Sequence, residues 1–389
     1  MFESLLAATR LTARRIVTAL GCLSTVAACT LFNSLDEYGP GQGGADASTD
    51  GPGSTPGADA DTCQHAQPPV RPAKNGSADS ARLVFALDGL FVGLPPNAGT
   101  ATIGYDLDNV CTCPGPPSCN AAPKKSNTAN NCDGENGVDN SGAELIQTIT
   151  LAAGSDGNPN AAISEGRSGL LIQLAGYNGT ADDDDLQVTF FATAGTELDG
   201  DGRPIRPVHD GNDTWRVRRD SLFGGNGDGP NYIGANRDDH AYVANGVLVA
   251  RVDFPLSFGN IDAILNDTVI TARVDGSGPT TKLLDGRIVG RWRSSDLLTA
   301  LDSVSDPLVT GGGVCGSSAL YQQLKGEICA AVDLRGRASE DSQQPLLNCD
   351  ALGMVMSFTA EVAKLGTAAD RTPPVHYCGA GYTDSCPAF

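Results

Sequence analysis

The sequence predicts a mainly β protein: an antiparallel β-sandwich or jelly-roll-like body, stabilised by disulfides, with a few short helices in its C-terminal part. Short apolar runs recur along the chain, and several alternate with polar residues at the period of two that half-buried strands show. Clusters of Gly, Asn, Asp and Pro separate these runs without helical patterns between them, which argues against βαβ units. An even number of cysteines outside the leader adds a disulfide framework.

The first strand-like run is RLVFALD at 82–88. The clearest alternation lies in 186–192, where Leu186, Val188 and Phe190 would share one face of a strand. In chain order, the predicted strands are 82–88, 145–151, 169–175, 186–192, 246–254, 268–274 and 283–289.

Helical signals come later in the chain. Residues 294–304 open with Ser-Ser-Asp, residue types that favour a helix N-terminus. Residues 317–332 repeat apolar side chains every four positions, at Leu320, Leu324 and Ile328. In 349–365 the apolar side chains alternate instead, at Met354, Met356 and Phe358, so we predict a strand there. We expect the helices to pack on the sandwich or between its strands.

Composition limits the classes of function. Acidic residues number 46 against 26 basic ones, a net charge of −20, so a nucleic-acid partner is not expected. Divalent cations or a basic partner fit this charge better. The 48 Gly and 23 Pro, with only 5% aromatic residues, disfavour a helical bundle.

The N-terminus predicts export and lipid anchoring. Arg10, Arg14 and Arg15 precede an apolar run, 16–28, that is too short to span a bilayer. The run ends in Val-Ala-Ala before Cys29, which resembles a bacterial lipobox, so Cys29 would become the acylated first residue. Thr30 after that cysteine suggests the outer membrane of a two-membrane bacterium. The alternative is an ordinary signal peptide, with Cys29 as a disulfide partner.

Three regions follow from this pattern: a lipoprotein signal peptide at 1–28, a flexible low-complexity tether at 29–80, and a disulfide-stabilised body at 81–389 with its helices in 294–389. The tether is rich in Gly, Asp, Ser and Pro and has few large apolar residues, so it cannot bury enough surface to offset ordering entropy. Cys63, near its end, is expected to staple it to the body.

Twelve cysteines, less Cys22 in the signal and Cys29, leave ten for up to five disulfides. Nine of them fall into two clusters, of four and five cysteines. A disulfide from Cys63 to the C-terminal cluster would leave an even number of cysteines to pair within each cluster. The alternative is a zinc site among the first cluster, but it lacks paired C-x-x-C knuckles. The ten candidates are Cys63, then Cys111, Cys113, Cys119 and Cys132, then Cys315, Cys329, Cys349, Cys378 and Cys386.

The most distinctive segment, 103–144, combines cysteines with oxygen ligands suited to calcium. Residues 133–144 match an EF-hand at positions 1, 3, 7 and 12, but place Val138 where a turn glycine belongs. We therefore predict calcium outside an EF-hand, the alternative being a solvated acidic loop. The candidate ligands are Asp106, Asp108, Asp133, Glu135, Asp139 and Asn140.

The other acidic clusters are interpreted as polar turns. These are the four-Asp run 182–185, the loop 199–202 and Asp228-Gly229. For the run 182–185, a bound counterion is the lesser alternative, because four adjacent like charges repel one another.

Catalytic signatures are mostly missing: the sequence has no G-x-S-x-G, no H-E-x-x-H and no P-loop. His240, beside two carboxylates, is interpreted as a surface residue rather than a base. The acidic residues are too numerous for any one pair to indicate glycoside hydrolysis. Trp215, Trp292 and Tyr232 are expected to pack in the core rather than to stack on sugars.

A group of uncharacterised bacterial cell-envelope lipoproteins resembles this chain in the lipobox, the tether, GYDLDNVCTC at 104–113, CDGENGVDNSG at 132–142, LLIQLAGYNGTADDDDLQVTFF at 170–191 and LLDGRIVGRW at 283–292. The resemblance spans nearly the whole chain. It implies an envelope location, and it carries no activity or site residues to transfer.

Three functions therefore stand as hypotheses. The first is a non-enzymatic, membrane-tethered binding module, stabilised by calcium, with a glycan or envelope protein as partner. The second is a polysaccharide-active hydrolase using paired carboxylates, and the third is a purely structural envelope protein.

Overall fold

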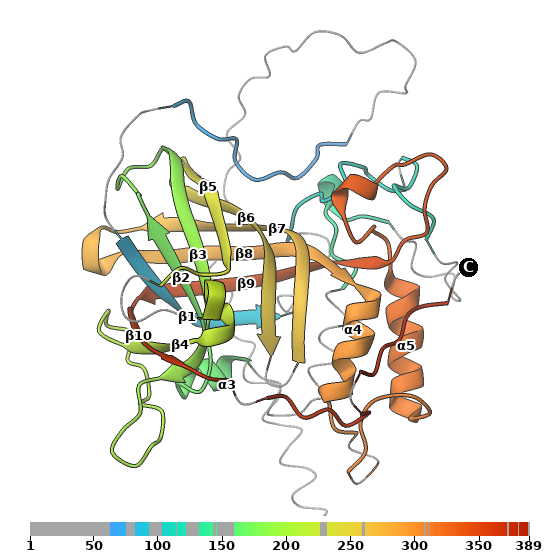
Figure 1. Cartoon of the computed structure of the whole chain (residues 1–389). Helices are drawn as coiled ribbons and strands as arrows, with labels where there is room; N and C mark the ends of the chain where they lie inside the picture. The colour runs from blue at the N-terminus through green and yellow to red at the C-terminus, as the bar shows by residue number, and fades with distance from the viewer. Residues whose placement is uncertain are drawn as a thin grey trace, which may run out of the picture. The chain divides into compact units, whose positions relative to one another are not determined.

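The computed structural model describes residues 63–74, 82–92, 103–113, 115–121, 132–142, 145, 159–225, 232–258, 261–306, 309, 311–371, 373–379 and 381–387 (Figure 1). All of these belong to one compact unit, formed by Ala60–Leu94 and Gly99–Phe389. The predicted signal segment, Cys29 and the tether up to residue 62 lie outside the described residues.

Strands supply most of the regular structure. They are β1 (Arg82–Val92), β2 (Leu170–Ala175), β3 (Asp183–Thr196), β4 (Thr214–Arg218), β5 (Asn236–Ala244), β6 (Val247–Phe258), β7 (Ile261–Asp275), β8 (Lys282–Arg293), β9 (Ala351–Val362) and β10 (Lys364–Ala369).

The helices are short. They are α3 (Pro159–Ser164), α4 (Ser294–Ala300) and α5 (Ala319–Ala331), with 3-10 turns η2 (Glu135–Gly137), η4 (Arg219–Ser221), η5 (Phe223–Gly225), η6 (Gly278–Thr280), η7 (Leu301–Ser303) and η8 (Ala338–Glu340). Both predicted C-terminal helices form, and Ser318 caps α5 by accepting a hydrogen bond from the Tyr321 N–H.

The prediction of a sandwich or jelly roll is wrong, because the sheet closes into an eight-stranded antiparallel barrel. The order is β1-β9-β8-β7-β6-β5-β3-β2, and the ring closes where β2 pairs with β1. β3 makes this possible by pairing with β2 along one edge and β5 along the other. Alternating side chains are common to sandwiches and barrels, so the pattern that revealed the strands could not distinguish the two.

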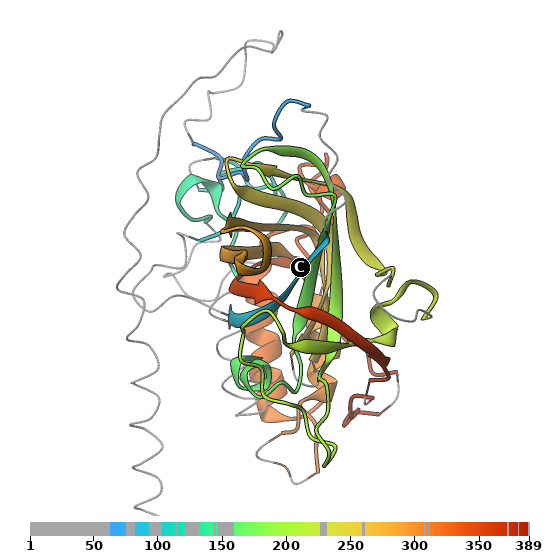
Figure 2. The same cartoon turned by 90° about the vertical axis from the view of Figure 1, so that its left-hand side faces the viewer.

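Two further strands extend β3 beyond the barrel. β4 pairs with the end of β3, and β10 lies parallel to β4 (Figure 2). The sequence analysis missed β4, β5 and β10, which are short or begin with polar residues. The predicted strands at 82–88, 169–175, 186–192, 246–254, 268–274, 283–289 and 349–365 form, whereas 145–151 lies outside the described residues except for Leu145.

The hairpin between β5 and β6 follows from two residues. Asn245 and Gly246 both have positive φ, 52° and 78°, as a two-residue type I′ turn requires. This turn matches the right-handed twist of the strands that it joins.

The barrel interior is the main core. Phe190 of β3 and Phe254 of β6 meet edge to face, with ring centroids 5.4 Å apart. Apolar residues of α4 and α5, including Leu298 and Ile328, belong to the same cluster, so the helices extend this core (Figure 1). Trp292 lies within it, while Trp215 of β4 and Tyr232 are buried in a second cluster, so all three pack in the core, as predicted.

The outer face of the barrel is also apolar on one side. Val249, Val269, Val289 and Val355 point away from the interior on four neighbouring strands, β6 to β9. The segment 103–113 crosses this face and covers it with Ile103, Tyr105 and Leu107. These strands are therefore buried on both faces, which explains why β9 shows an unbroken buried stretch at its start.

Five disulfides form, as the ten cysteines predicted: Cys63–Cys111, Cys113–Cys132, Cys119–Cys349, Cys315–Cys378 and Cys329–Cys386. The expected link from Cys63 into the C-terminal cluster is wrong. Cys63 instead joins Cys111, and Cys119 reaches Cys349 beside β9, because these partners are brought together by the packing of 103–121 on the barrel.

Residues 63–74, which we call the strap, are joined to the body. Besides the disulfide of Cys63, the Tyr242 hydroxyl donates a 2.6 Å hydrogen bond to the Pro69 carbonyl, and the Arg71 guanidinium stacks 4.6 Å from the Tyr242 ring centroid. Cys63 thus staples the chain to the body, as predicted. Across the described ranges, no helix combines the length and apolar character needed to cross a bilayer.

Breaking Cys119–Cys349 should cost more stability than breaking Cys113–Cys132. The first closes a span of 230 residues and ties the 103–121 region to β9, whereas the second closes 19. We expect Cys119→Ala/Cys349→Ala to lower the free energy of unfolding by about 2–5 kcal/mol. Guanidinium denaturation of both double variants checks this, and an equal or larger loss in Cys113→Ala/Cys132→Ala would contradict it.

Candidate metal centre

The candidate site begins in the segment 103–113, where apolar residues that contact the barrel alternate with aspartates. Ile103, Tyr105 and Leu107 face the barrel, and the Tyr105 hydroxyl meets the Thr271 hydroxyl at 2.9 Å. The intervening Asp106 and Asp108 do not belong to that apolar cluster, and both are buried, at 3% and 7% exposure. The strap and the loop 132–142 cover them.

Asp106 is held between the strap and the loop. Its backbone N–H donates to the Ala66 carbonyl at 2.8 Å, and the Ala66 N–H donates to the Asn136 carbonyl at 2.8 Å. One carboxylate oxygen, Oδ2, contacts Nδ1 of His65 in the strap. The other, Oδ1, is buried without a hydrogen-bond partner among the described residues.

Asp139 approaches from the loop on the other side. Its Oδ2 accepts a 2.6 Å hydrogen bond from the Leu107 N–H, and its backbone N–H donates to the Tyr105 carbonyl at 3.1 Å. Its side chain is 1% exposed, and Oδ1 finds no donor in the part of the chain that the structure describes. A Cβ on Gly353 of β9 would lie within 3 Å of Asp139, so the close approach requires glycine there.

Asp108 completes the group. Its Oδ1 accepts a 2.9 Å hydrogen bond from the Val110 N–H. Ligand oxygens of Asp106, Asp108 and Asp139 all lie within 4.8 Å of one another. This is the spacing at which one small ion can contact all three.

Burial is the first cause of the raised pKa values of Asp108, Asp133 and Asp139, and neighbouring carboxylates add to it. Burial, followed by the charges of Asp108 and Asp333, raises the pKa of Asp139 well above its usual range. Burial raises the pKa of Asp108 to about 6 and that of Asp133 to about 8. Like charges in a dry site cannot all ionise without a compensating cation or protons.

A buried arginine near the group already has a partner. Arg291 of β8 is fully buried and forms a bidentate pair with Asp341, at 2.8 and 2.6 Å. It also donates to the Leu107 carbonyl at 2.5 Å, and so supports the backbone between Asp106 and Asp108. Against the lowering effect of burial, the charges of Asp341, and after it of Asp139 and Asp108, raise the pKa of Arg291, so Arg291 also compensates part of the carboxylate charge.

The six sequence-predicted ligands are thus divided. Asp106, Asp108 and Asp139 come together, whereas Glu135 is exposed and Asn140 is half-buried. Asp133 lies beside the group and accepts a 2.5 Å hydrogen bond from the Thr112 N–H. Sequence reasoning missed two neighbours of the group, His65 and Asp333, which come from distant segments and carry no local signal.

Two cavities flank the loop 134–138. One, of about 420 Å³, is lined by Cys63, Gln64, Cys111, Thr112, Asp133, Gly134 and Asn136. The other, of about 220 Å³, is lined by Ala66, Gln67, Gly104, Tyr105, Glu135, Asn136, Val138 and Arg287. The first cavity brings solvent to Asp133 and to the Cys63–Cys111 disulfide beside the carboxylates.

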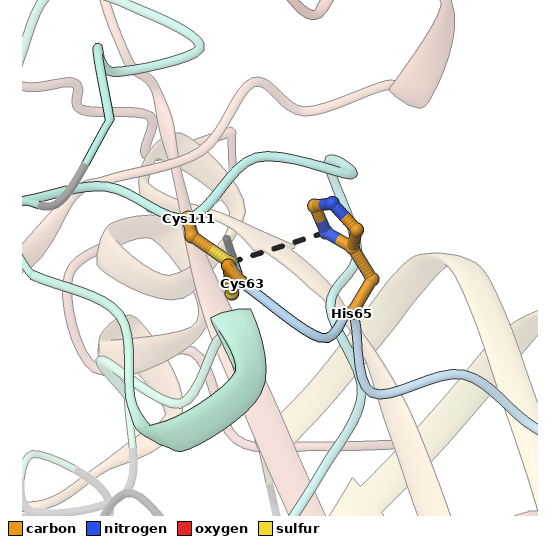
Figure 3. Close-up of side chains that lie close together, drawn as sticks. All are labelled: Cys63, His65 and Cys111. Atoms are coloured by element: carbon orange, nitrogen blue, oxygen red, sulfur yellow. Dashed lines mark hydrogen bonds between the residues drawn. A yellow bond between two sulfur atoms is a disulfide. The ribbon is translucent and has the colours of Figure 1, made fainter. Parts of the chain in front are cut away.

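A second group of candidate metal ligands includes two cysteines that line the first of these cavities. Cys63, His65 and Cys111 each offer a ligand atom within 4.8 Å of the other two (Figure 3). The two sulfurs form a disulfide, so the oxidised protein presents no thiolate there. The zinc alternative for the first cysteine cluster is likewise overturned, since those cysteines enter three different disulfides.

The other acidic clusters that the structure describes serve turns, as predicted. Asp183 is buried and accepts the Asn178 N–H at 2.8 Å, and Asp182 accepts the Asn245 N–H at 2.9 Å. Asp199 accepts the N–H groups of Asp201 and Arg203, each at 2.9 Å. Asp228 and Gly229 lie outside the described residues. His240 is exposed, with Nδ1 3.9 Å from Asp185, as expected for a surface residue.

No family model, curated protein or solved structure matches this chain. The site must therefore be interpreted from its own geometry.

The raised pKa values predict how stability depends on pH without metal. A carboxyl whose pKa is higher in the folded state stabilises folding below its unfolded pKa, near 3.8, and loses that contribution as pH rises through the folded value, about 8 for Asp133. We expect chelator-treated protein to lose stability between pH 5 and pH 8. Asp133→Asn should reduce this loss by roughly 2 kcal/mol.

Guanidinium denaturation at pH 5, 6, 7 and 8 measures the slope. This window avoids Asp220, Asp253 and Asp384, whose lowered pKa values act at more acidic pH. Equal slopes for wild type and Asp133→Asn would show that this carboxyl titrates as an ordinary one.

Proposed function

We propose that this protein is an exported, lipid-anchored, non-enzymatic envelope module whose body binds calcium at Asp106, Asp108 and Asp139. The observation that carries the metal proposal is the pair of unpartnered oxygens, Asp106 Oδ1 and Asp139 Oδ1, neither of which has a hydrogen-bond partner within the described ranges. Buried carboxylate oxygens without donors are costly, and a cation compensates them directly.

The donor chemistry favours calcium. All three residues offer hard oxygens from loops, and calcium accepts six to eight such ligands in flexible geometry. Water or backbone carbonyl oxygens would supply the remaining ligands. The site departs from an EF-hand, because its ligands come from two loops, 103–113 and 132–142, rather than one.

The hydrolase alternative gains less support. Paired glycosidase carboxylates stand about 5–10 Å apart, on either side of a substrate. Here the ligand oxygens lie within 4.8 Å and the three side chains are buried, so a sugar ring has no room between them. A shared ion explains both the spacing and the burial.

The anchoring proposal rests on the sequence. The lipobox places the acylated residue at Cys29, and the chain from there to Cys63 would link the lipid to the strap. The resemblance to uncharacterised envelope lipoproteins supports the same location. A glycan or envelope protein is the proposed partner, and nucleic acid is disfavoured by the net charge of −20.

Calcium should stabilise the full chain, purified in detergent. At 100 times the dissociation constant, binding adds about 2.7 kcal/mol, which corresponds to a rise in Tm of roughly 5 °C or more. Asp139→Asn should abolish the rise while leaving the calcium-free protein at least as stable as wild type. The reason is that asparagine still accepts the Leu107 N–H but removes one of three facing charges.

The matched control is Asp201→Asn, the same change in an exposed acidic loop, which should keep the full shift. A thermal melt with calcium, with magnesium and with chelator provides the measurement. If calcium raises Tm equally in wild type and Asp139→Asn, the proposed site is wrong; if no divalent ion shifts wild type, the metal proposal fails.

Cys29→Ala should move the protein out of the membrane fraction, because the acyl chains are the proposed anchor. Fractionation of cells, with mass spectrometry of the mature N-terminus, checks this outcome. An unmodified Cys29 in membrane-bound wild-type protein would contradict lipidation.

A further inference from the structure

We propose that the Cys63–Cys111 disulfide is an exchange-reactive bond, and that its reduction creates a zinc-class metal site from Cys63, His65 and Cys111. This site adjoins the proposed calcium site, with which it would share Asp106, and it does not require bound calcium. The three residues already offer ligand atoms within 4.8 Å of one another, with the imidazole beside the sulfurs (Figure 3).

Access sets this disulfide apart from another in the same region. Both Cys63 and Cys111 line the 420 Å³ cavity, and Cys63 is partly exposed. By contrast, Cys119 and Cys349 are 0% and 4% exposed. A thiolate that enters the cavity can reach Cys63 Sγ without unfolding the body.

His65 supplies the group that exchange needs. Its Nδ1 lies 3.9 Å from Cys111 Sγ, and its side chain is 31% exposed. An imidazole N–H this close can donate to the sulfur on which negative charge develops, so Cys111 becomes the better leaving group. Attack is therefore expected at Cys63, with departure of Cys111.

The reaction balances with an external dithiol. One thiolate of the dithiol attacks Cys63 Sγ, a mixed disulfide forms, and the S–S electron pair moves to Cys111 Sγ beside His65. The second thiolate then attacks the dithiol's own sulfur in the mixed disulfide and releases Cys63. The protein disulfide gains two electrons and the dithiol becomes a disulfide, while its two protons end on the cysteines or in solvent.

The reduced group matches zinc chemistry. Two thiolates and an imidazole are the usual donors of zinc sites, and metal binding displaces the two thiol protons. Gly137 keeps space at this point: a Cβ there would lie 2.7 Å from Asp106 Oδ2 and 2.9 Å from Cys111 Sγ. Asp106 therefore borders the same space and provides an oxygen as the fourth donor, while its other oxygen faces the carboxylate group.

The strap gives this chemistry a structural consequence. In the oxidised protein, Cys63 fixes the start of the strap covalently, and noncovalent contacts of His65, Ala66, Gln67, Pro69 and Arg71 hold the rest. A metal bridging Cys63, His65 and Cys111 would hold the strap in the same place after reduction. Reduction without metal would release its N-terminal end.

The test is limited reduction of the full chain in detergent. A neutral dithiol, dithiothreitol, is added in small excess, free thiols are alkylated, and mass spectrometry locates them. We expect Cys63 and Cys111 to be labelled before the buried pair Cys119 and Cys349, and His65→Ala to slow the labelling of Cys63 and Cys111 by threefold or more. Labelling of Cys119 and Cys349 first, or an unchanged rate in His65→Ala, would overturn the proposal.

The metal is then probed with Co²⁺, whose bonds to thiolate absorb in the near ultraviolet. The reduced wild type should show this band and lose it on addition of Zn²⁺; His65→Ala should weaken it at least threefold. Cys113→Ala/Cys132→Ala, which keeps the pair, should retain it, whereas Cys63→Ala/Cys111→Ala should not. Absence of the band in reduced wild type overturns the site, and calcium melts of the oxidised protein report separately on the proposed function.

Discussion

The structure depends on covering the apolar outer face of a closed barrel. The interior is filled by Phe190, Phe254 and their neighbours, yet the valines of β6 to β9 also turn apolar surface outward. Burying that surface is favourable by about 25 cal/mol per Å², so the segment 103–113 lies across it. Everything distinctive about the candidate site follows from this second layer.

Covering that face buries charge as a consequence. The segment that packs Tyr105 and Leu107 on the barrel also carries Asp106 and Asp108, which lie in the space that the strap and the loop 132–142 close. The backbone groups there are satisfied by paired hydrogen bonds, but two carboxylate oxygens are not, within the residues described. The apolar contacts of this layer are therefore satisfied, but two of its buried carboxylate oxygens lack hydrogen-bond donors in the described ranges. A bound cation compensates such oxygens.

Disulfides hold this layer where regular structure is scarce. The region 103–142 contains no strand among its described residues, and three of the five disulfides end in it. Cys119–Cys349 attaches it to β9, and Cys63–Cys111 attaches the strap to it. The Cys63–Cys111 disulfide also lies beside His65. The attachment of the strap, the proposed reduction of this disulfide and the proposed metal sites therefore involve neighbouring residues.

The sequence alone determined the local properties: most strands, both C-terminal helices, the number of disulfides, and a carboxylate-rich segment with three residues that do come together. These depend on periodicity, capping and ligand type, which neighbouring residues encode. Only the tertiary structure decided that β3 pairs with β2 and β5 to close a barrel, that Cys63 meets Cys111, and that His65 meets Asp106. Each of these joins segments far apart in the chain, and side-chain alternation is the same whichever partners the segments find.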